Sequence, residues 1–230
     1  MSSHLAVNEQ NQLEENRNSN SPSQPSFLRI IAKIISYVFH PLFVPVYIVA
    51  FLVYIQPYLY AGFSAWDKQI VVLQAFVMYT FFPLVTVLLL KALKFIDSIF
   101  LKTQRERVIP YIACGIWYFW AWYVRHNLPE TPHELVYFSL AIFIASSIGL
   151  LANIYMKVSM HAISMGIVAT FLMLMGFSQD ISFTVYISVS LLVAGLVCTS
   201  RFIVSDHTQR EVYAGLLIGV VSQLIGYWFA

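Results

Sequence analysis

Long stretches without charge dominate the amino-acid sequence. A helix needs about 20 apolar residues to cross the roughly 30 Å hydrocarbon core of a bilayer, and six windows come close to this length or exceed it. None of them shows the sustained two-residue alternation of a strand, so the pattern predicts transmembrane helices. The windows cover residues 69–90, 108–124, 135–156, 158–179, 181–200 and 212–230.

A seventh apolar stretch, residues 34–66, is longer and is interrupted by three prolines. Because proline ends or bends a helix, we expect two elements in this part of the chain. The first is an interfacial helix formed by "FLRIIAKIISYVF" (27–39), and the second is a span from about 41 to 57. The sequence therefore predicts an all-α fold, a polytopic transmembrane helix bundle with six to seven spans.

The beginning of the chain has a different composition. Residues 1–26 are rich in Asn, Gln, Ser and Glu, and such a segment buries too little apolar surface to offset the entropy cost of ordering. We predict a disordered polar tail over 1–26, followed by one transmembrane helical domain over 27–230.

Composition supports the membrane assignment. Of the 230 residues, 59% are hydrophobic and only 10% are charged, which is far from the balance of a soluble globular domain. We expect membrane lipids as partners and no nucleic acid. The sequence gives no indication of oligomeric state.

The cations are distributed unevenly between the two ends of the predicted spans. If the spans alternate in direction, all thirteen Lys and Arg residues except Lys68 and Arg125 lie on the side that carries the N-terminal tail. The positive-inside rule then places that side in the cytoplasm.

Gly215 and Gly219 form a GxxxG pattern in the last span, which predicts close packing of that helix against a neighbour.

Three polar clusters lie at the ends of predicted spans on this cation-rich side. Two spans separate each cluster from the next, so all three fall on one face of the membrane. Cations, a hydroxyl and imidazoles together suit a phosphate site, since cations neutralise the oxyanion and imidazoles can act as nucleophile or acid. No thiolate pair or carboxylate cluster indicates a metal. The clusters are Lys102, Arg105, Glu106 and Arg107; Lys157, Ser159 and His161; and Arg201, His207 and Glu211.

The spacing within these clusters resembles the type 2 phosphatidic acid phosphatase and vanadium haloperoxidase superfamily. The family pattern Ser-Arg-x5-His-x3-Asp is matched from Ser200 to Glu211, with Glu in place of Asp. Its Pro-Ser-Gly-His motif is matched by "VSMH" (158–161), and its Lys-x6-Arg-Pro motif by Lys102, six residues and "IP" (109–110). The resemblance covers about residues 100–220.

This resemblance implies a metal-independent lipid phosphatase without a cofactor, acting on a phosphate or diphosphate monoester such as phosphatidate or a polyprenyl diphosphate. His207 would be the nucleophile, Glu211 would orient its imidazole, and His161 would protonate the leaving oxygen. The resemblance also implies a multi-pass protein of the bacterial inner membrane, although bacterial members usually face their site outward, opposite to the side that the cation count predicts. The phosphate oxygens would be held by Lys102, Ser159 and Arg201, with Arg107 in place of the missing motif arginine.

Other interpretations of these residues stay open. "TQRE" (208–211) has the pattern of a capping box, so Glu211 has a structural role available to it. A lone His161 in an apolar helix is commonly a packed, hydrogen-bonded residue. The replaced motif positions favour a second hypothesis, a catalytically inactive descendant that binds an anionic lipid head group. A third, a transporter, depends on the span count alone, and no internal repeat supports it.

Overall fold

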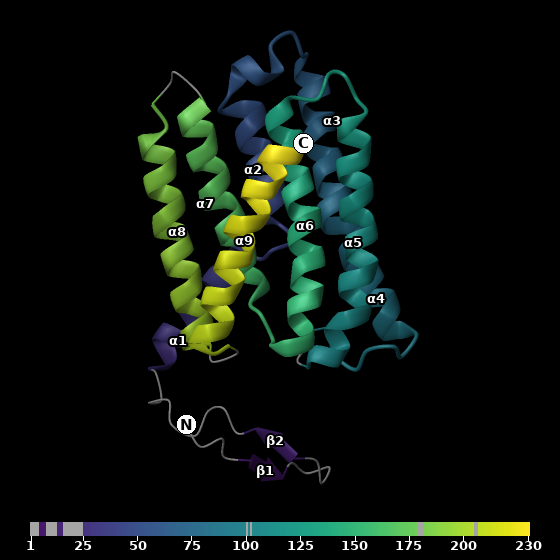
Figure 1. The fold of residues 1–230 in the computed structure, drawn as a ribbon, viewed down its shortest axis with the longest axis vertical. Helices are drawn as coiled ribbons and strands as arrows, with labels where there is room; N and C mark the ends of the chain where they lie inside the picture. Colours follow the sequence, from purple (N-terminus) through teal and green to yellow (C-terminus); the bar gives the residue numbers. More distant parts are fainter. Residues whose placement is uncertain are drawn as a thin grey trace.

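The computed structural model describes residues 5–7, 13–15, 25–99, 101, 103–178, 182–204 and 207–230. Helices make up almost all of the part from residue 25 onward (Figure 1). Their bounds are α1 Ser26–Val38, α2 Val44–Tyr54, the 3-10 helix η1 Pro57–Tyr60, α3 Ala65–Phe76, the π-helix η2 Val77–Phe81, α4 Phe82–Ala92, α5 Gln104–His126, α6 His133–Tyr155, α7 Met160–Ser178, α8 Thr184–Ile203 and α9 Gln209–Phe229.

The predicted N-terminal tail contains one described element. Strand β1, Leu5–Val7, pairs antiparallel with β2, Leu13–Glu15. The other residues of the predicted disordered tail, up to residue 24, lie outside the described residues. The helical domain follows from α1.

Within the described residues, five helices are long and apolar enough to cross a membrane: α3 to α4 as one continuous helix, α6, α7, α8 and α9. They match five of the six predicted windows, so the predicted all-α fold is confirmed from residue 25 onward, with five candidate membrane spans. The count of six to seven spans is not. α5 has 23 residues but is too polar to qualify, and α2 is apolar but has only 11 residues.

Helix α9 packs against both α6 and α7 (Figure 1), and glycines permit the close approach. A Cβ at Gly219 would collide with the carbonyl oxygen of Ile163, and one at Gly226 would lie 2.7 Å from that of Tyr137. A Cβ at Gly215 would lie 2.7 Å from the carbonyl oxygen of Ser159. The prediction that Gly215 and Gly219 mark a close helix contact is therefore confirmed, and the contact joins α9 to α7.

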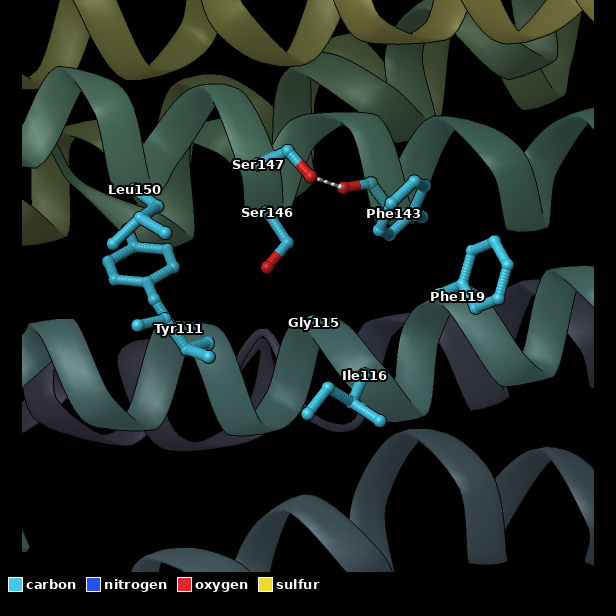
Figure 2. A pocket seen from close by; sticks show the side chains of 9 residues that line it. Tyr111, Gly115, Ile116, Phe119, Phe143, Ser146, Ser147 and Leu150 are labelled. Atoms are coloured by element: carbon cyan, nitrogen blue, oxygen red, sulfur yellow. Dashed lines mark hydrogen bonds between the residues drawn. The ribbon is translucent and has the colours of Figure 1, made fainter.

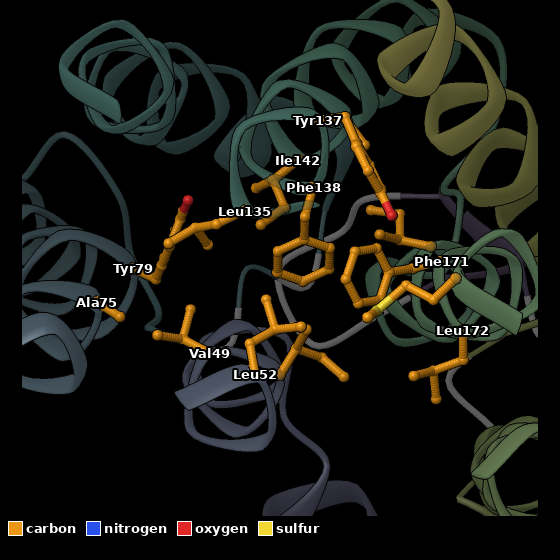
Figure 3. Close-up of a cluster of buried hydrophobic side chains, with 14 of the residues drawn as sticks. Val49, Leu52, Ala75, Tyr79, Leu135, Tyr137, Phe138, Ile142, Phe171 and Leu172 are labelled. Atoms are coloured by element: carbon orange, nitrogen blue, oxygen red, sulfur yellow. The ribbon is translucent and has the colours of Figure 1, made fainter. Parts of the chain in front are cut away.

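The apolar core lies between α2, α3, α6 and α7 (Figure 3). Phe138 of α6 and Phe171 of α7 pack with ring centroids 4.8 Å apart, and Leu52 of α2 is fully buried in the same cluster. This core fixes α6 and α7 relative to each other. It thereby fixes the loop between them, which carries Lys157 and Ser159.

The buried Arg125 lies at the end of the bundle where the chain terminates. Its Nη1 donates to the Ala121 carbonyl oxygen (3.0 Å) and to the Tyr79 hydroxyl (3.4 Å), and its guanidinium lies 5.1 Å from the centre of the Tyr79 ring. Tyr79 belongs to the π-helical segment η2, just before Pro83, whose missing N–H interrupts regular helix bonding. Arg125, counted above as a topology signal, thus also ties α5 to η2.

The starts of α5, α7 and α9 and the end of α8 lie at the opposite end of the bundle, together with α1 (Figure 1). The described residues of all three polar clusters lie on or next to these termini. The clusters thus lie at one end of the bundle, and hydrogen bonds join them.

Candidate functional site

Arg107 connects the first cluster to the second. Its side chain lies in the first turn of α5 and is 6% exposed. Its Nη1 donates to the carbonyl oxygen of Val158 (2.9 Å), and its Nε donates to that of Leu101 (3.0 Å). Lys102, the predicted phosphate ligand beside it, lies outside the described residues. Among the other members of this cluster, Arg105 is exposed and Glu106 forms a capping box with Thr103.

Ser159 connects the second cluster to the third. Its backbone N–H donates to the carbonyl oxygen of Glu211 across the contact between α7 and α9 (3.1 Å). Its hydroxyl accepts from the N–H of Ala162 (3.4 Å) and so caps the start of α7. Ser159 is fully buried, and its O–H remains able to donate to a bound oxyanion.

His207 has a defined orientation. Its Nδ1 lies 3.0 Å from the carbonyl oxygen of Lys157 and 3.2 Å from Glu211 Oε2. Both partners accept hydrogen bonds when Glu211 is ionised, so we infer that Nδ1 carries the proton. The lone pair of a neutral imidazole then lies on Nε2, which is the arrangement that a nucleophilic histidine requires.

Glu211 serves two structural purposes at once. Its Oε2 accepts from the N–H of Thr208 (3.0 Å), and the Thr208 hydroxyl accepts from the N–H of Glu211 (3.4 Å). This is the capping box predicted from the sequence, and it is confirmed. Since the same Oε2 contacts His207, capping and histidine orientation are compatible. The side chains of His207 and Glu211 are 2% and 5% exposed.

The protonation state of His207 follows from these surroundings. Burial lowers the pKa of His207, the hydrogen bond to Glu211 opposes this effect, and the cations Arg201 and Arg107 add to it. The net result is a lowered pKa, so the imidazole is neutral at neutral pH.

His161 and Arg201 meet at Ser36, a residue of α1. The Nε2 of His161 lies 3.0 Å from the Ser36 carbonyl oxygen, and Arg201 Nη1 donates to the Ser36 hydroxyl (3.4 Å). The ring of His40 contacts that of His161 edge-on, with centroids 5.3 Å apart. Burial, followed by the charge of Arg201, lowers the pKa of His40 to about 4.

Sequence reasoning missed Ser36 and His40. Neither residue belongs to the three polar clusters. A signal was present, however: Ala32, Ser36 and His40 recur at a spacing of four, and Ala32 and Ser36 are the buried residues of α1. Small and polar residues in one stripe of an amphipathic helix indicate a face that packs against other helices.

The structure thus brings together Arg107, Ser159, His161, Arg201, His207 and Glu211 at one end of the bundle. Electrostatic interactions link His161 to both Arg201 and His207. The N-termini of α7 and α9 both begin at this end, and helix N-termini favour bound anions. No group of three or more His, Cys, Asp or Glu side chains suited to a metal occurs among the described residues. The arrangement suits binding of an oxyanion next to a neutral imidazole.

Comparison of the sequence with family models, with curated proteins and with solved structures gives no match.

Proposed function

We propose that this protein is a membrane-embedded lipid phosphatase that hydrolyses a phosphate or diphosphate monoester of a lipid through a phosphohistidine intermediate. The observation that carries the proposal is the geometry of His207. Its Nδ1 faces two acceptors, the Lys157 carbonyl oxygen and Glu211 Oε2, so that Nε2 is the nucleophilic nitrogen. The spacing of the three clusters, from which the family resemblance was inferred, supports the same function.

The reaction would proceed in two steps. In the first, the Nε2 lone pair of His207 attacks phosphorus, the bond to the lipid oxygen breaks, and protonated His161 gives its proton to that oxygen. In the second, water attacks the phosphohistidine and gives a proton to His161, and the P–N bond breaks. Arg201, Ser159 and the helix N-termini would stabilise the charge on the phosphoryl oxygens.

We also propose that α5 and the segment around α2, residues 41–57, cross the membrane together with the five candidate spans, in a multi-pass protein of the bacterial inner membrane. The excess of Lys and Arg at the site end favours a cytoplasmic site. Labelling of Ser64→Cys and Arg210→Cys in intact cells tests the side, in a background without the free cysteines Cys114 and Cys198. Reaction at position 64 alone with an impermeant thiol reagent supports a cytoplasmic site, and reaction at position 210 alone contradicts it.

Release of phosphate from a panel of lipids tests the activity. Purified protein is assayed with phosphatidate, lysophosphatidate and a polyprenyl diphosphate, as wild type and as His207→Ala. We expect hydrolysis of at least one substrate and a loss of at least roughly 10³-fold in His207→Ala. His126→Ala is the matched control, since His126 is exposed at the other end of α5, and it should retain full activity. Hydrolysis that survives in His207→Ala would disprove the assignment.

A second candidate function is non-catalytic binding of an anionic lipid head group. One observation favours it: Arg107 and His161 each hydrogen-bond a backbone carbonyl oxygen through a side-chain nitrogen. Arg107 contacts the carbonyl oxygen of Val158, and His161 contacts that of Ser36. Groups engaged in this way hold the helix ends together without any chemistry. In the same assay, this function predicts no turnover in wild type, together with binding of phosphatidate vesicles that weakens in Arg201→Gln.

A further inference from the structure

An apolar groove runs along the outer face of the bundle between α5 and α6 (Figure 2). Its volume is about 310 Å³. Along its length the lining changes from Tyr111 and Leu150, through Gly115 and Ser146, to Phe119 and Phe143 (Figure 2).

Gly115 keeps the middle of the groove open. A Cβ at this position would have one neighbour within 4 Å among the described residues, Ser146 Oγ at 3.7 Å. The Ser146 hydroxyl points into the same space, whereas that of its neighbour Ser147 donates to the Phe143 carbonyl oxygen (Figure 2). Ile116 and Phe119 flank the opening and are 63% and 40% exposed. The groove therefore opens toward the surroundings of the bundle. These are lipid if α5 crosses the membrane beside the candidate span α6, as proposed above.

One end of the groove adjoins the candidate site. Tyr111, at that end, follows Arg107 by one turn of α5. The Tyr111 ring packs against Gly149, where a Cβ would lie 3.1 Å from the ring. The same Cβ would lie 3.4 Å from Ile163, which is one turn beyond Ser159. Tyr111 thus stands between the groove and the residues that would hold a phosphate.

The hydroxyl of Tyr111 is buried and has no hydrogen-bond partner among the described residues. A buried hydroxyl without a partner costs free energy, and such groups in native proteins call for an explanation. Here the hydroxyl lies beside Gly149, at the end of the groove that is nearer to Arg107. A ligand with an oxygen at the junction of a polar head and an apolar tail would satisfy it.

We infer that the α5–α6 groove binds the hydrocarbon tail of the lipid whose phosphate is held at the site, and that Tyr111 donates to an oxygen at the head–tail junction. The inference rests on the proposed function, because that function supplies the phosphate end of the ligand. From Tyr111 to Phe119 the groove follows eight residues of α5, about 12 Å. The tail is thus a long acyl or prenyl chain.

Filling the groove tests the inference. Gly115→Leu places a side chain in the open space, and Gly195→Leu on α8 is the matched control, since a Cβ at Gly195 has no neighbour within 4 Å among the described residues. We expect the KM for a long-chain lipid phosphate to rise about tenfold in Gly115→Leu and to stay unchanged in Gly195→Leu. A tenfold change corresponds to the affinity lost when about two methylene groups of the tail are no longer buried. The kcat/KM for a short-chain, soluble phosphate monoester should be unchanged. Equal effects of both substitutions, or equal effects on both substrates, would overturn the inference.

Crosslinking to the wild-type protein provides a readout without turnover. Phosphatidate with a photoreactive tail should label the groove, at residues such as Ile116, more strongly than phosphatidylcholine with the same tail. Tyr111→Phe removes no hydrogen bond within the described protein, so it should weaken the labelling without lowering the melting temperature. Labelling that depends on the head group, in a protein that hydrolyses no lipid phosphate, would support the groove as the site of the tail and contradict the proposed phosphatase activity. Labelling that ignores the head group means that ordinary bilayer lipid fills the groove, and it contradicts the inference.

Discussion

Replacement of Gly219 by alanine tests whether the contact between α7 and α9 positions the site. A Cβ at 219 would collide with the carbonyl oxygen of Ile163 and approach Gly166 Cα to 2.9 Å. These neighbours are backbone atoms, which cannot rotate away as a side chain can. The two helices must therefore separate, and the hydrogen bond from the Ser159 N–H to the Glu211 carbonyl oxygen lies on the same interface.

The magnitude follows from two opposing effects. Alanine has up to about 1 kcal/mol more helix propensity than glycine, and overpacking of a close contact costs about 1–3 kcal/mol. Because the collision is with backbone, we take the upper end of that cost and expect a net loss of about 2 kcal/mol in the free energy of unfolding. Gly195→Ala, in open space on α8, should be neutral or stabilising by up to about 1 kcal/mol.

The assay is reversible unfolding in mixed detergent micelles, followed by circular dichroism, for wild type and both variants. A variant that loses stability by this route should also lose phosphate release at temperatures where it remains folded, since Ser159 and Glu211 move apart. Equal unfolding free energies for Gly219→Ala and Gly195→Ala would refute the close packing of α7 on α9.

Two further predictions concern ionisation. The folded-state pKa of His40 is about 4 and its ordinary value is 6.5, so the unfolded chain binds the proton more strongly and stability falls as the pH drops below 6.5. At pH 5 this residue alone should lower the free energy of unfolding by about 2 kcal/mol. His40→Asn should remove that part of the difference between the unfolding free energies at pH 8 and pH 5, and an unchanged difference would show that His40 is not buried as described. Glu211→Gln removes the carboxylate that raises the pKa of His207 and that favours the tautomer with the proton on Nδ1, so kcat should fall by roughly 10²–10⁴-fold. The acid limb of the profile of kcat/KM against pH should move to lower pH, because the pKa of His207 falls. An acid limb that moves to higher pH would contradict the assigned pairing of His207 with Glu211.

Local features of the chain were predictable from the sequence. The capping box joins Thr208 to Glu211, and the pattern that indicates a close helix contact consists of Gly215 and Gly219. Both sequence signals therefore lie within a few positions, and the structure contains both features. The assumed alternation of spans predicted that the three polar clusters lie at one end of the bundle. The prediction was possible because a helix that runs the length of a bundle has only two ends, so the order of the elements determines the side.

Contacts between distant segments were not predictable in this way. Ser36 meets His161 and Arg201, which are 125 and 165 positions away, and nothing local to α1 specifies those partners. The partners of Arg107 are backbone carbonyl oxygens, which carry no sequence signature. The span count was not predictable either. The absence of charge over 108–124 had suggested a span, but α5 as a whole does not meet the length and hydropathy criteria that the five candidate spans meet.

The most direct test of the proposed chemistry is detection of the covalent intermediate. Purified protein is mixed with a lipid phosphate substrate, quenched within milliseconds under alkaline conditions that preserve phosphohistidine, and mapped by mass spectrometry. The proposed mechanism predicts phosphate on Nε2 of His207 in wild type and none in His207→Ala. In His161→Ala the phosphohistidine should be more abundant when the substrate has a good leaving group, because the second step then lacks its base. Turnover that proceeds with no phosphate on His207, or with phosphate on another residue, would contradict it.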